Sequence, residues 1–416
     1  MKNNFSKIVI IFLSALILRL SLIFIAYHGD LNNNISWGTL AFQRGLSNYY
    51  EGKDWLYSAP NQPPLTILTF AAAKAIWQGI ENFSWFLNNR VGIFPSGFIW
   101  FWESKGMILL VKLPAIFADL IIGWLIYKYL SSKKARLATI LTIVWLFNPV
   151  IWYNSAIWGQ TDSMVNLLGF AAILFLFKKD LIKSFAFLAL SALFKGSLVI
   201  FMPLIFAYAV MQKYPLKKWL QAALGILAVS LLVSIWFFPY LDLPLWLFKL
   251  YQGRILSGEI GDLTANAFNF WWLVNPGKVL DSTIYLGLQA RIWGIIIMVF
   301  SLGINIRWLK KKTTEQQLFF SLMFISLCSF IFMTRIHERY LYPFFIPTTL
   351  LLGSYQGLPM VYSILSLTNL LNLYNLFFAP SIKLTENLLK NPIFSIILSI
   401  VNLFVFGWLL ESKKKY

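Results

Sequence analysis

Stretches of about 20 apolar residues recur along the whole chain, and they constrain its fold more than any other feature. The first of them, residues 8–27, contains a single charge, Arg19. A helix needs roughly 20 apolar residues to cross a bilayer. Only 12% of the 416 residues are charged, whereas charged residues make up about a quarter of a soluble domain. The sequence therefore predicts an all-α polytopic membrane protein.

Lysine and arginine gather in short loops between these stretches, where acids are scarce. These loops contain Lys133, Lys134 and Arg136; Lys178, Lys179 and Lys183; Lys213, Lys217 and Lys218; and Arg307 and Lys310 to Lys312. Cytoplasmic loops carry excess Lys and Arg, so we expect these loops and both termini inside the cell. The net charge of +19 then records topology and does not indicate a nucleic-acid partner.

This charge pattern predicts about 12 transmembrane helices. The expected spans are residues 8–27, 106–130, 137–157, 163–178, 182–195, 197–212, 218–239, 283–306, 316–335, 341–356, 359–379 and 392–411. Residues 1–240 form the first expected module, with an outer loop at 28–105, and residues 241–416 the second. Residues 63–79 are apolar as well, but a span there would invert every later basic loop. We therefore expect this segment to lie on or dip into the outer surface, one of the short amphipathic helices in the two large loops.

Few residues are available for disulfides or soft metal sites. Cys328 is the only cysteine, and His28 and His337 are the only histidines. An intrachain disulfide, a cysteine-based metal site and a three-histidine site are therefore excluded.

The polar residues of interest are all expected at the outer ends of spans. They are Asp30, Asp162, Lys195, Asn266 and the run His337-Glu338-Arg339. A carboxylate can take a proton from an acceptor hydroxyl, and cations can stabilise charge on a departing phosphate. The group therefore has the composition needed to transfer a sugar from a lipid phosphate.

Each of these residues also has a purely structural interpretation. Asp30 may be read as an ordinary interfacial acid, Asp162 as a helix cap, and Lys195 or Arg339 as a snorkelling cation. Arg19 and Asp119 are different, because both fall near the middle of a span, where an isolated charge costs roughly 2.5–3.5 kcal/mol. Their similar expected depth predicts a structural Arg19–Asp119 pair.

Six short motifs occur in an order that resembles a known superfamily. They are His28-Gly29-Asp30 with Trp37, Pro63 to Thr66, Phe117 to Asp119, Asn148-Pro149 with Gly159 to Asp162, Asn266 to Trp271, and Ile336 to Tyr340. Together they resemble the GT-C glycosyltransferases that use polyprenyl-phosphate sugars. The nearest likeness is to bacterial relatives of the second mannosyltransferase of GPI-anchor synthesis, and a more distant one is to the dolichol-linked-oligosaccharide glucosyltransferases.

The resemblance implies a GT-C fold and a role for each matching residue. It implies that Asp30 is the general base, that His337, Arg339 and Lys195 hold the donor phosphate, and that substrate contacts come from His28, Trp37, Gln160, Asp162, Asn266 and Glu338. We expect no metal cofactor, since protein cations can neutralise one phosphate. A divalent metal held by Asp30 and Asp162 is the weaker alternative.

The sequence thus predicts an inverting hexosyltransferase, for mannose or glucose, in the cytoplasmic membrane of a prokaryote, with its site facing outward. Its expected partners are a polyprenyl-phosphate sugar, a lipid-linked or extracytoplasmic glycan or protein acceptor, and membrane lipids. Two alternatives stay open: a lipid or sugar transporter or flippase, and an oligosaccharide ligase or polymerase with a pyrophosphate-linked donor.

Overall fold

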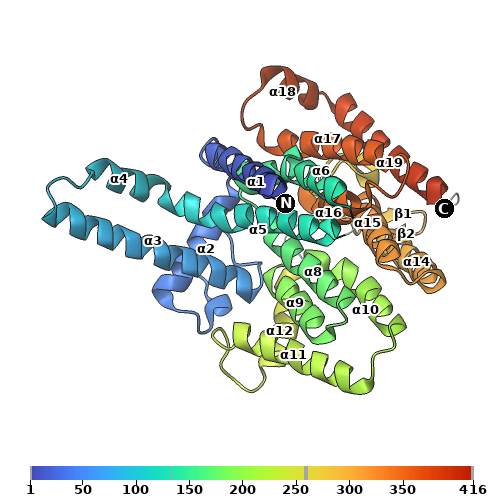
Figure 1. The fold of residues 1–416 in the computed structure, drawn as a ribbon, viewed down its shortest axis with the longest axis horizontal. Helices are drawn as coiled ribbons and strands as arrows, with labels where there is room; N and C mark the ends of the chain where they lie inside the picture. Colours follow the sequence, from blue (N-terminus) through green and yellow to red (C-terminus); the bar gives the residue numbers. More distant parts are fainter. Residues whose placement is uncertain (1, 133, 257–260, 414–416) are drawn as a thin grey trace.

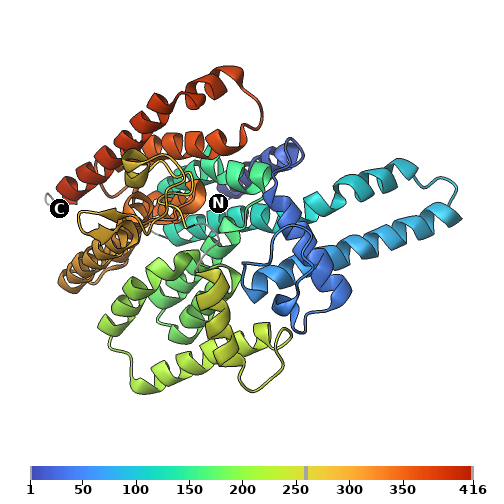
Figure 2. The ribbon, with the colours of Figure 1, turned by 180° about the vertical axis from the view of Figure 1, so that it is seen from behind.

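The computed structural model describes residues 2–132, 134–256 and 261–413. Lys133 of the first basic loop and residues 414–416 lie outside this part. The described chain is helical apart from one short β-hairpin, as Figures 1 and 2 show from opposite sides. The prediction of an all-α polytopic membrane protein is confirmed.

The N-terminal part of the chain forms a first helix, a polar break and two further helices. Helix α1 (Lys2–Leu22) ends earlier than the expected span, and α2 (Asp30–Arg44) begins at Asp30. The 3₁₀ turn η1 (Tyr49–Glu51) leads to α3 (Pro64–Arg90), which has Pro64 at its first position, where a missing N–H costs nothing. Helix α3 is 27 residues long and so is not the short amphipathic helix that the sequence predicted.

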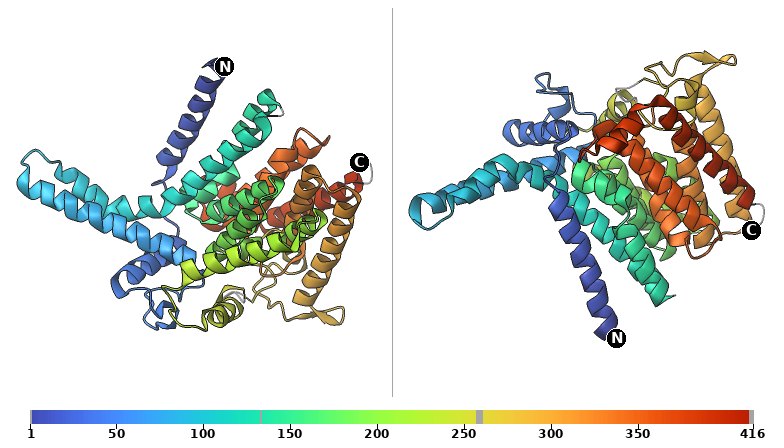
Figure 3. Two further views of the ribbon diagram at one scale, coloured as in Figure 1. Left: turned by 60° about the horizontal axis from the view of Figure 1, so that its bottom comes forward. Right: turned by 90° about the horizontal axis from the view of Figure 1, so that it is seen from above.

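Helix α3 forms a long hairpin with the segment that follows it. Helix α4 (Ser96–Phe101), the π-turn η2 (Trp102–Gly106) and α5 (Met107–Ser131) form one continuous helix of 36 residues. Trp77 and Trp102 each donate an indole N–H to the other's carbonyl, at 3.1 and 3.0 Å. The hairpin projects away from the other helices (Figures 1 and 3). The first outer loop was therefore predicted about ten residues too long, because this helix already begins at Ser96.

The middle of the chain forms the next group of helices. These are α6 (Ala135–Leu146), α7 (Pro149–Trp152) with the π-turn η3 (Tyr153–Trp158), α8 (Asp162–Phe177), α9 (Leu181–Phe194), η4 (Gly196–Phe201) with α10 (Met202–Met211), and α11 (Leu216–Ser234). Between α6 and α7 the axis bends by 44°. The bend has a local cause, since Pro149 lacks an N–H and the Asn148 side chain caps Val150 instead.

The second large loop contains short elements only. They are α12 (Leu243–Leu250), the π-turn η5 (Tyr251–Ile255), α13 (Phe270–Val274), β1 (Ile284–Tyr285) and β2 (Leu288–Gln289). The hairpin turns at Leu286-Gly287, both with positive φ, as a two-residue primed turn requires. Helix α14 (Ala290–Lys311) follows, so the span expected at 283–306 begins about seven residues later than predicted.

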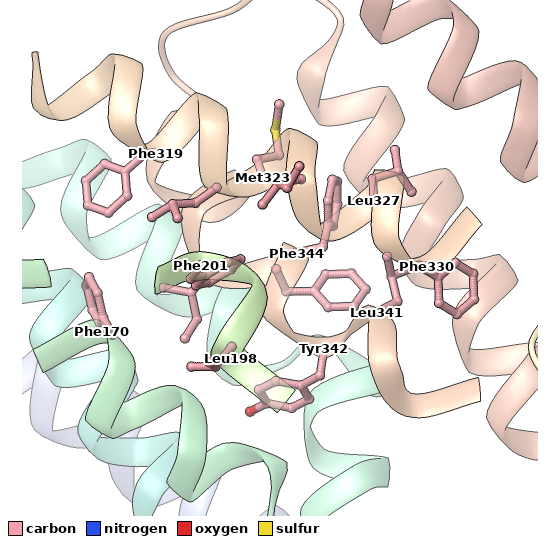
Figure 4. Close-up of a cluster of buried hydrophobic side chains, with 14 of the residues drawn as sticks. Phe170, Leu198, Phe201, Phe319, Met323, Leu327, Phe330, Leu341, Tyr342 and Phe344 are labelled. Atoms are coloured by element: carbon pink, nitrogen blue, oxygen red, sulfur yellow. The ribbon is translucent and has the colours of Figure 1, made fainter. Parts of the chain in front are cut away.

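The remaining helices return along the bundle. They are α15 (Glu315–Phe332), the 3₁₀ turn η6 (Glu338–Leu341), α16 (Tyr342–Leu351), α17 (Leu358–Phe377), α18 (Lys383–Lys390) and α19 (Pro392–Lys413). Helix α15 is largely enclosed, since its residues 317–331 are all buried. Figure 4 shows apolar side chains of this core, among them Phe319 of α15 and Phe170 of α8, whose ring centroids lie 6.5 Å apart. This core holds the ends of α8, α9 and α16 in fixed positions.

Five helices in the described part are long and apolar enough to cross a membrane by themselves. They are Ser96–Ser131, Leu216–Ser234, Ala290–Lys311, Glu315–Phe332 and Pro392–Glu411, and the bent pair α6–α7 makes a sixth. The helices Asp162–Phe177, Leu181–Phe194 and Gly196–Met211 are apolar but shorter. A helix or helix pair occupies each of the expected spans, whereas the number that crosses a membrane stays a prediction.

Candidate functional site

Nine polar or aromatic side chains from four distant parts of the chain converge at one end of the bundle. We call them the Asp30 group: His28, Asp30, Trp158, Gln160, Asp162, Lys195, His337, Glu338 and Arg339. They come from the α1–α2 junction, the η3–α8 turn, the end of α9, and η6. Every site residue predicted from sequence belongs to this group or lies beside it, except Trp37.

Asp30 has the most exposed carboxylate of the Asp30 group. Its carboxylate Oδ2 accepts hydrogen bonds from Gln160 Nε2 at 2.5 Å and from Trp158 Nε1 at 3.3 Å. The side chain remains 40% exposed, whereas those of Asp162 and Glu338 are at most 3% exposed. Asp30 is therefore the carboxylate that an incoming hydroxyl can reach.

The surroundings of Asp30 favour its ionised form. Burial by itself raises the pKa of a carboxyl, but the Arg339 charge, the neighbouring His28 ring and the hydrogen bonds from Trp158 and Gln160 together hold the pKa of Asp30 below its ordinary value. An opposite charge and donated hydrogen bonds both stabilise a carboxylate. Asp30 is thus a proton acceptor at neutral pH.

His28 serves the site as a neutral ring. Its Nδ1 accepts the backbone N–H of Asp30 at 3.0 Å, so this nitrogen carries no proton. Burial lowers the pKa of His28, as do Arg339 and Lys112, against the opposing effect of Asp30. The ring lies 4.6 Å from both Trp158 and Phe377, centroid to centroid. His28 therefore fixes the backbone at Asp30 and forms part of an aromatic wall.

The turn between η3 and α8 positions the side chains of Trp158 and Gln160 beside Asp30. Gly159 has φ +86°, a left-handed conformation that suits glycine, and it ends the helix. The N–H groups of Gly159 and Gln160 both donate to Asn154 O, at 3.1 and 3.0 Å. The chain then reverses into α8, and this reversal brings the Gln160 amide and the Trp158 indole to the same carboxylate oxygen.

Asp162 and Lys195 form a buried ion pair. Lys195 Nζ lies 2.6 Å from Asp162 Oδ1, and the two side chains are 9% and 3% exposed. Asp162 is the first residue of α8, where the helix dipole favours an anion. Lys195 follows the end of α9 with an extended backbone (φ −162°), which turns its side chain toward Asp162. The simple helix-cap interpretation of Asp162 thus misses its main contact.

The run His337-Glu338-Arg339 supplies the second cation. Arg339 Nη1 donates to Glu338 Oε1 at 2.7 Å. Burial by itself lowers the pKa of an arginine, but Glu338, Tyr340, Asp30 and Asp162 together raise the pKa of Arg339. Burial raises the pKa of Glu338, against the opposing effect of Arg339. Glu338 Oε2 and Arg339 Nε are buried without a hydrogen-bond partner in the structure, so part of this pair remains available to another group.

The surroundings of His337, which the sequence predicts as a contact of the donor phosphate, disfavour the charged form of its ring. Burial lowers its pKa well below the ordinary value, and Arg339 and Lys195 lower it further. Its Nδ1 lies 3.5 Å from Arg339 Nη1. His337 is therefore a neutral ring beside two cations, and the positive charge of the site rests on Arg339 and Lys195.

Asn266 lies beside His337 through the backbone. Ala265 and Asn266 form β-bridges with His337, and Asn372 Nδ2 of α17 donates to Asn266 O at 2.7 Å. Asn266 has φ +68°, a conformation that asparagine tolerates better than most residues. These contacts place the segment around Asn266 against the start of η6.

Trp37, which the sequence predicts as a substrate contact, lies apart from the Asp30 group. It is 3% exposed and packs with Tyr49, Tyr50 and Ile67 in the core of the first outer loop. Its indole N–H donates to Ser58 O at 2.8 Å. Seven residues after Asp30 on α2, the side chain lies two turns along the helix, and the apolar cluster captures it there.

Two members of the site were missed by sequence reasoning. Trp158 directly precedes the Gly159 to Asp162 motif, and Phe377 stands at the end of an apolar span where nothing marks it as special. The rings of Trp158 and Phe377 lie 6.1 Å apart, with His28 in contact with both. Their proximity depends on the packing of α1, η3 and α17, which no local pattern reports.

Deeper in the bundle, Arg19 and Asp119 lie within contact distance, as the sequence predicts. Arg19 Nε is 3.2 Å from Asp119 Oδ2, and both side chains are fully buried. Asp119 also accepts hydrogen bonds from Ser155 at 2.5 Å, Ser163 at 2.6 Å and Tyr342 at 2.8 Å. We call these five residues the Asp119 hub. It joins α1, α5, η3, α8 and α16, and two of these elements, η3 and α8, carry members of the Asp30 group.

The carboxylates of the site are occupied by protein donors. Asp162 holds Lys195, and Asp30 Oδ2 accepts from Gln160 and Trp158. Among the described residues no group of three or more His, Cys, Asp or Glu side chains is arranged to hold a metal. These residues are therefore a poor fit for the Asp30–Asp162 metal site that the sequence offered as an alternative.

An apolar cavity of about 530 Å³ lies between α9, α10, α11 and α12. Its walls include Phe185, Leu188, Ala192, Met202, Phe206 and Tyr251. Tyr251 donates its hydroxyl to Ala192 O at 2.7 Å, three residues before Lys195. The cavity thus runs along α9 toward the end of that helix where Lys195 meets Asp162.

Comparison with known proteins finds a similarity over part of the chain. No family model matches the chain. The chain is 28% identical over 153 residues to GPI mannosyltransferase 1 of Candida albicans, which covers 35% of this chain and 37% of that protein. The chain therefore matches well under half the length of this relative. The similarity supports a glycosyltransferase and, with the apolar helices, an integral membrane protein.

Proposed function

We propose that this protein is an inverting glycosyltransferase that moves a hexose from a polyprenyl phosphate to an acceptor hydroxyl. The observation that carries the proposal is an ionised, partly exposed Asp30 held among Gln160, Trp158 and Arg339. A base for the acceptor and a cation for the leaving group are the two requirements of such a transfer.

The chemistry assigned to each residue follows from its exposure and charge. Asp30 takes the proton of the acceptor hydroxyl, and the oxygen attacks the anomeric carbon from the face opposite the phosphate. The bond from that carbon to the phosphate oxygen breaks, and its electron pair leaves with the phosphate. Arg339 and Lys195 stabilise the extra negative charge. A single displacement of this kind inverts the anomeric configuration.

A lipid-linked donor accounts for two further features. The cavity beside α9 has the apolar walls that an isoprenoid chain requires, and it approaches Lys195. The aromatic wall of His28, Trp158 and Phe377 provides the rings that pack on the apolar faces of sugars. The similarity to a GPI mannosyltransferase favours mannose, with glucose as the other hexose to compare.

The proposal extends to the setting of the reaction. We assign the Asp30 group to the extracytoplasmic face of a prokaryotic cytoplasmic membrane, because the basic loops join the opposite ends of the helices. Charge neutralisation is assigned to Arg339 and Lys195, without a metal. Full activity after treatment with EDTA is the expected result.

The test is a transfer assay with purified protein in nanodiscs. Synthetic polyprenyl-phosphate mannose and glucose serve as donors, glycolipids and oligosaccharides as acceptors, and NMR of the product reads the anomeric configuration. We expect transfer with inversion. Retained configuration contradicts the single displacement, and movement of the donor across the bilayer without transfer favours the transporter alternative.

A further inference from the structure

The structure assigns to Lys112 a role that sequence analysis did not suggest. Lys112 lies in α5, is fully buried, and its ammonium contacts four backbone carbonyls. The distances from Nζ are 2.8 Å to Ile23 O, 3.1 Å to Ala26 O, 3.1 Å to Ala156 O and 2.8 Å to Ile157 O. In the described part of the chain, none of its hydrogen bonds goes to a carboxylate.

The four carbonyls belong to the ends of two helical segments. Ile23 and Ala26 lie just beyond the end of α1, and Ala156 and Ile157 lie in the last turn of η3. The last carbonyls of a helix lack partners within the helix and carry its negative partial charge. One ammonium therefore caps two helix ends at once and offsets the cost of its own burial.

Both capped segments lead directly into the site. Asp30 follows Ala26 by four positions, and Ile157 precedes Trp158 and Gln160, which donate to Asp30. The relative position of these two segments decides whether the carboxylate meets its donors. The Lys112 ammonium donates hydrogen bonds to both segments.

Packing around Lys112 couples the same two segments a second time. A Cβ atom on Gly159 would lie 2.8 Å from Leu31 Cδ2 and 3.0 Å from Lys112 Cγ. Leu31, the residue after Asp30, packs against Val111, the residue before Lys112. The aliphatic part of the Lys112 side chain thus packs against the Gly159 turn, while its ammonium donates hydrogen bonds to the four carbonyls.

We propose that Lys112 is a positioning residue that fastens the α1–α2 junction to the η3–α8 turn and so sets the contact between Asp30 and its donors. The catalytic consequence rests on the proposed transfer reaction. The mechanical coupling of the two segments does not.

The first test is hydrogen–deuterium exchange of the full-length protein in nanodiscs, wild type against Lys112→Met. We expect peptides covering residues 23–36 and 153–163 to exchange faster together, while α14 and α15 stay protected. Lys128→Met, an exposed lysine later in the same helix, should leave both peptides unchanged. Unchanged exchange in both peptides of Lys112→Met overturns the proposal, and so does a uniform rise over the whole protein.

The second test is kinetic. A displacement of about 1 Å can lower a rate about 10²-fold, so we expect Lys112→Met to lower kcat by that order with little change in KM for the donor. The acid limb of the rate profile should also move to higher pH, because Asp30 loses hydrogen bonds that favour its charge. A fall in active protein without any shift of this limb contradicts positioning and indicates a structural role alone.

A second variant keeps the proposal testable should Lys112→Met fail to fold. Gly159→Ala introduces the Cβ that meets Leu31 and Lys112, and we expect the same pair of peptides and the same fall in kcat to respond. Faster exchange confined to residues 156–162 overturns the coupling. Wild-type protein that transfers no sugar contradicts the proposed function only, since the exchange experiments stand without activity.

Discussion

The Asp119 hub and the Asp30 group are two polar clusters in one apolar protein, and they are built in opposite ways. In the hub, Asp119 is fully buried and accepts from Arg19, Ser155, Ser163 and Tyr342. In the Asp30 group, the carboxylate is 40% exposed and its bonds engage a single oxygen. A fully buried cluster holds helices together, whereas one with a partly exposed carboxylate can receive a substrate.

The two clusters are also connected, which sharpens the contrast. Ser155 precedes Trp158 by three residues, Ser163 follows Asp162, and Tyr342 follows Arg339 by three. The hub therefore holds the helical segments in place close to the residues that form the site. Rigid support next to a polar, reachable site is the arrangement that catalysis requires.

The largest expected effect separates chemistry from stability. Asp30→Asn removes the base while keeping the size of the side chain, so kcat should fall by about 10² to 10⁴-fold. The melting temperature should stay close to that of wild type, because the side chain is partly exposed. Transfer assays with thermal unfolding measure both, and Asp54→Asn, an exposed acid in the same loop, is the control. Equal turnover by Asp30→Asn removes the base assignment.

The converse effect is expected in the hub. Asp119→Asn leaves the Arg19 charge buried without its counter-ion, and breaking a buried pair in this way costs about 3–5 kcal/mol. Unfolding in a denaturant series should report this loss, while kcat per folded molecule changes little. Asp180→Asn, which breaks the exposed pair with Lys183, should cost less than about 1 kcal/mol. Stability losses of equal size in the two variants contradict the distinction between hub and surface.

A smaller effect concerns pH. Because the pKa of Asp30 lies below its ordinary value of 3.8, activity should be present above that pKa and lost only as the pH falls through it. Gln160→Leu removes one of the hydrogen bonds that lower this pKa, so the acid limb of kcat/KM should move to higher pH. Steady-state rates across the acid range measure the shift. A limb that stays in place shows that Gln160 does not stabilise the carboxylate.

The smallest expected effect lies outside both clusters. Trp37→Phe loses the hydrogen bond to Ser58 O and part of the loop packing, with a stability loss of about 1–2 kcal/mol. KM and kcat should equal those of wild type, since Trp37 packs in the loop core. A raised KM for the sugar donor restores Trp37 as a substrate contact.

Much of the site was predictable because helix order and charge parity act over long ranges of sequence. The charge pattern predicts Asp30, Asp162, Lys195 and Arg339 at the same ends of alternate spans, and in the structure these residues belong to one group. Position along a span likewise predicts that Arg19 and Asp119 lie at the same depth. The errors fall where such rules do not reach: the length of α3, the start at Ser96, and the burial of Trp37.

The sequence by itself determined that the protein is a helical membrane protein, and it predicted which end of the bundle carries the polar residues. The length of the apolar stretches and the charge of the loops are local properties that can be read from the sequence. Only the tertiary structure decided which charges are already paired, that burial lowers the pKa of both histidines, and that the Lys112 ammonium contacts carbonyls of two helical segments. These outcomes depend on contacts between residues tens to hundreds of positions apart, such as Lys112 with Ile23 or Asp119 with Tyr342. The energy of such a contact depends on the packing around it, and no pattern in the sequence encodes that packing directly.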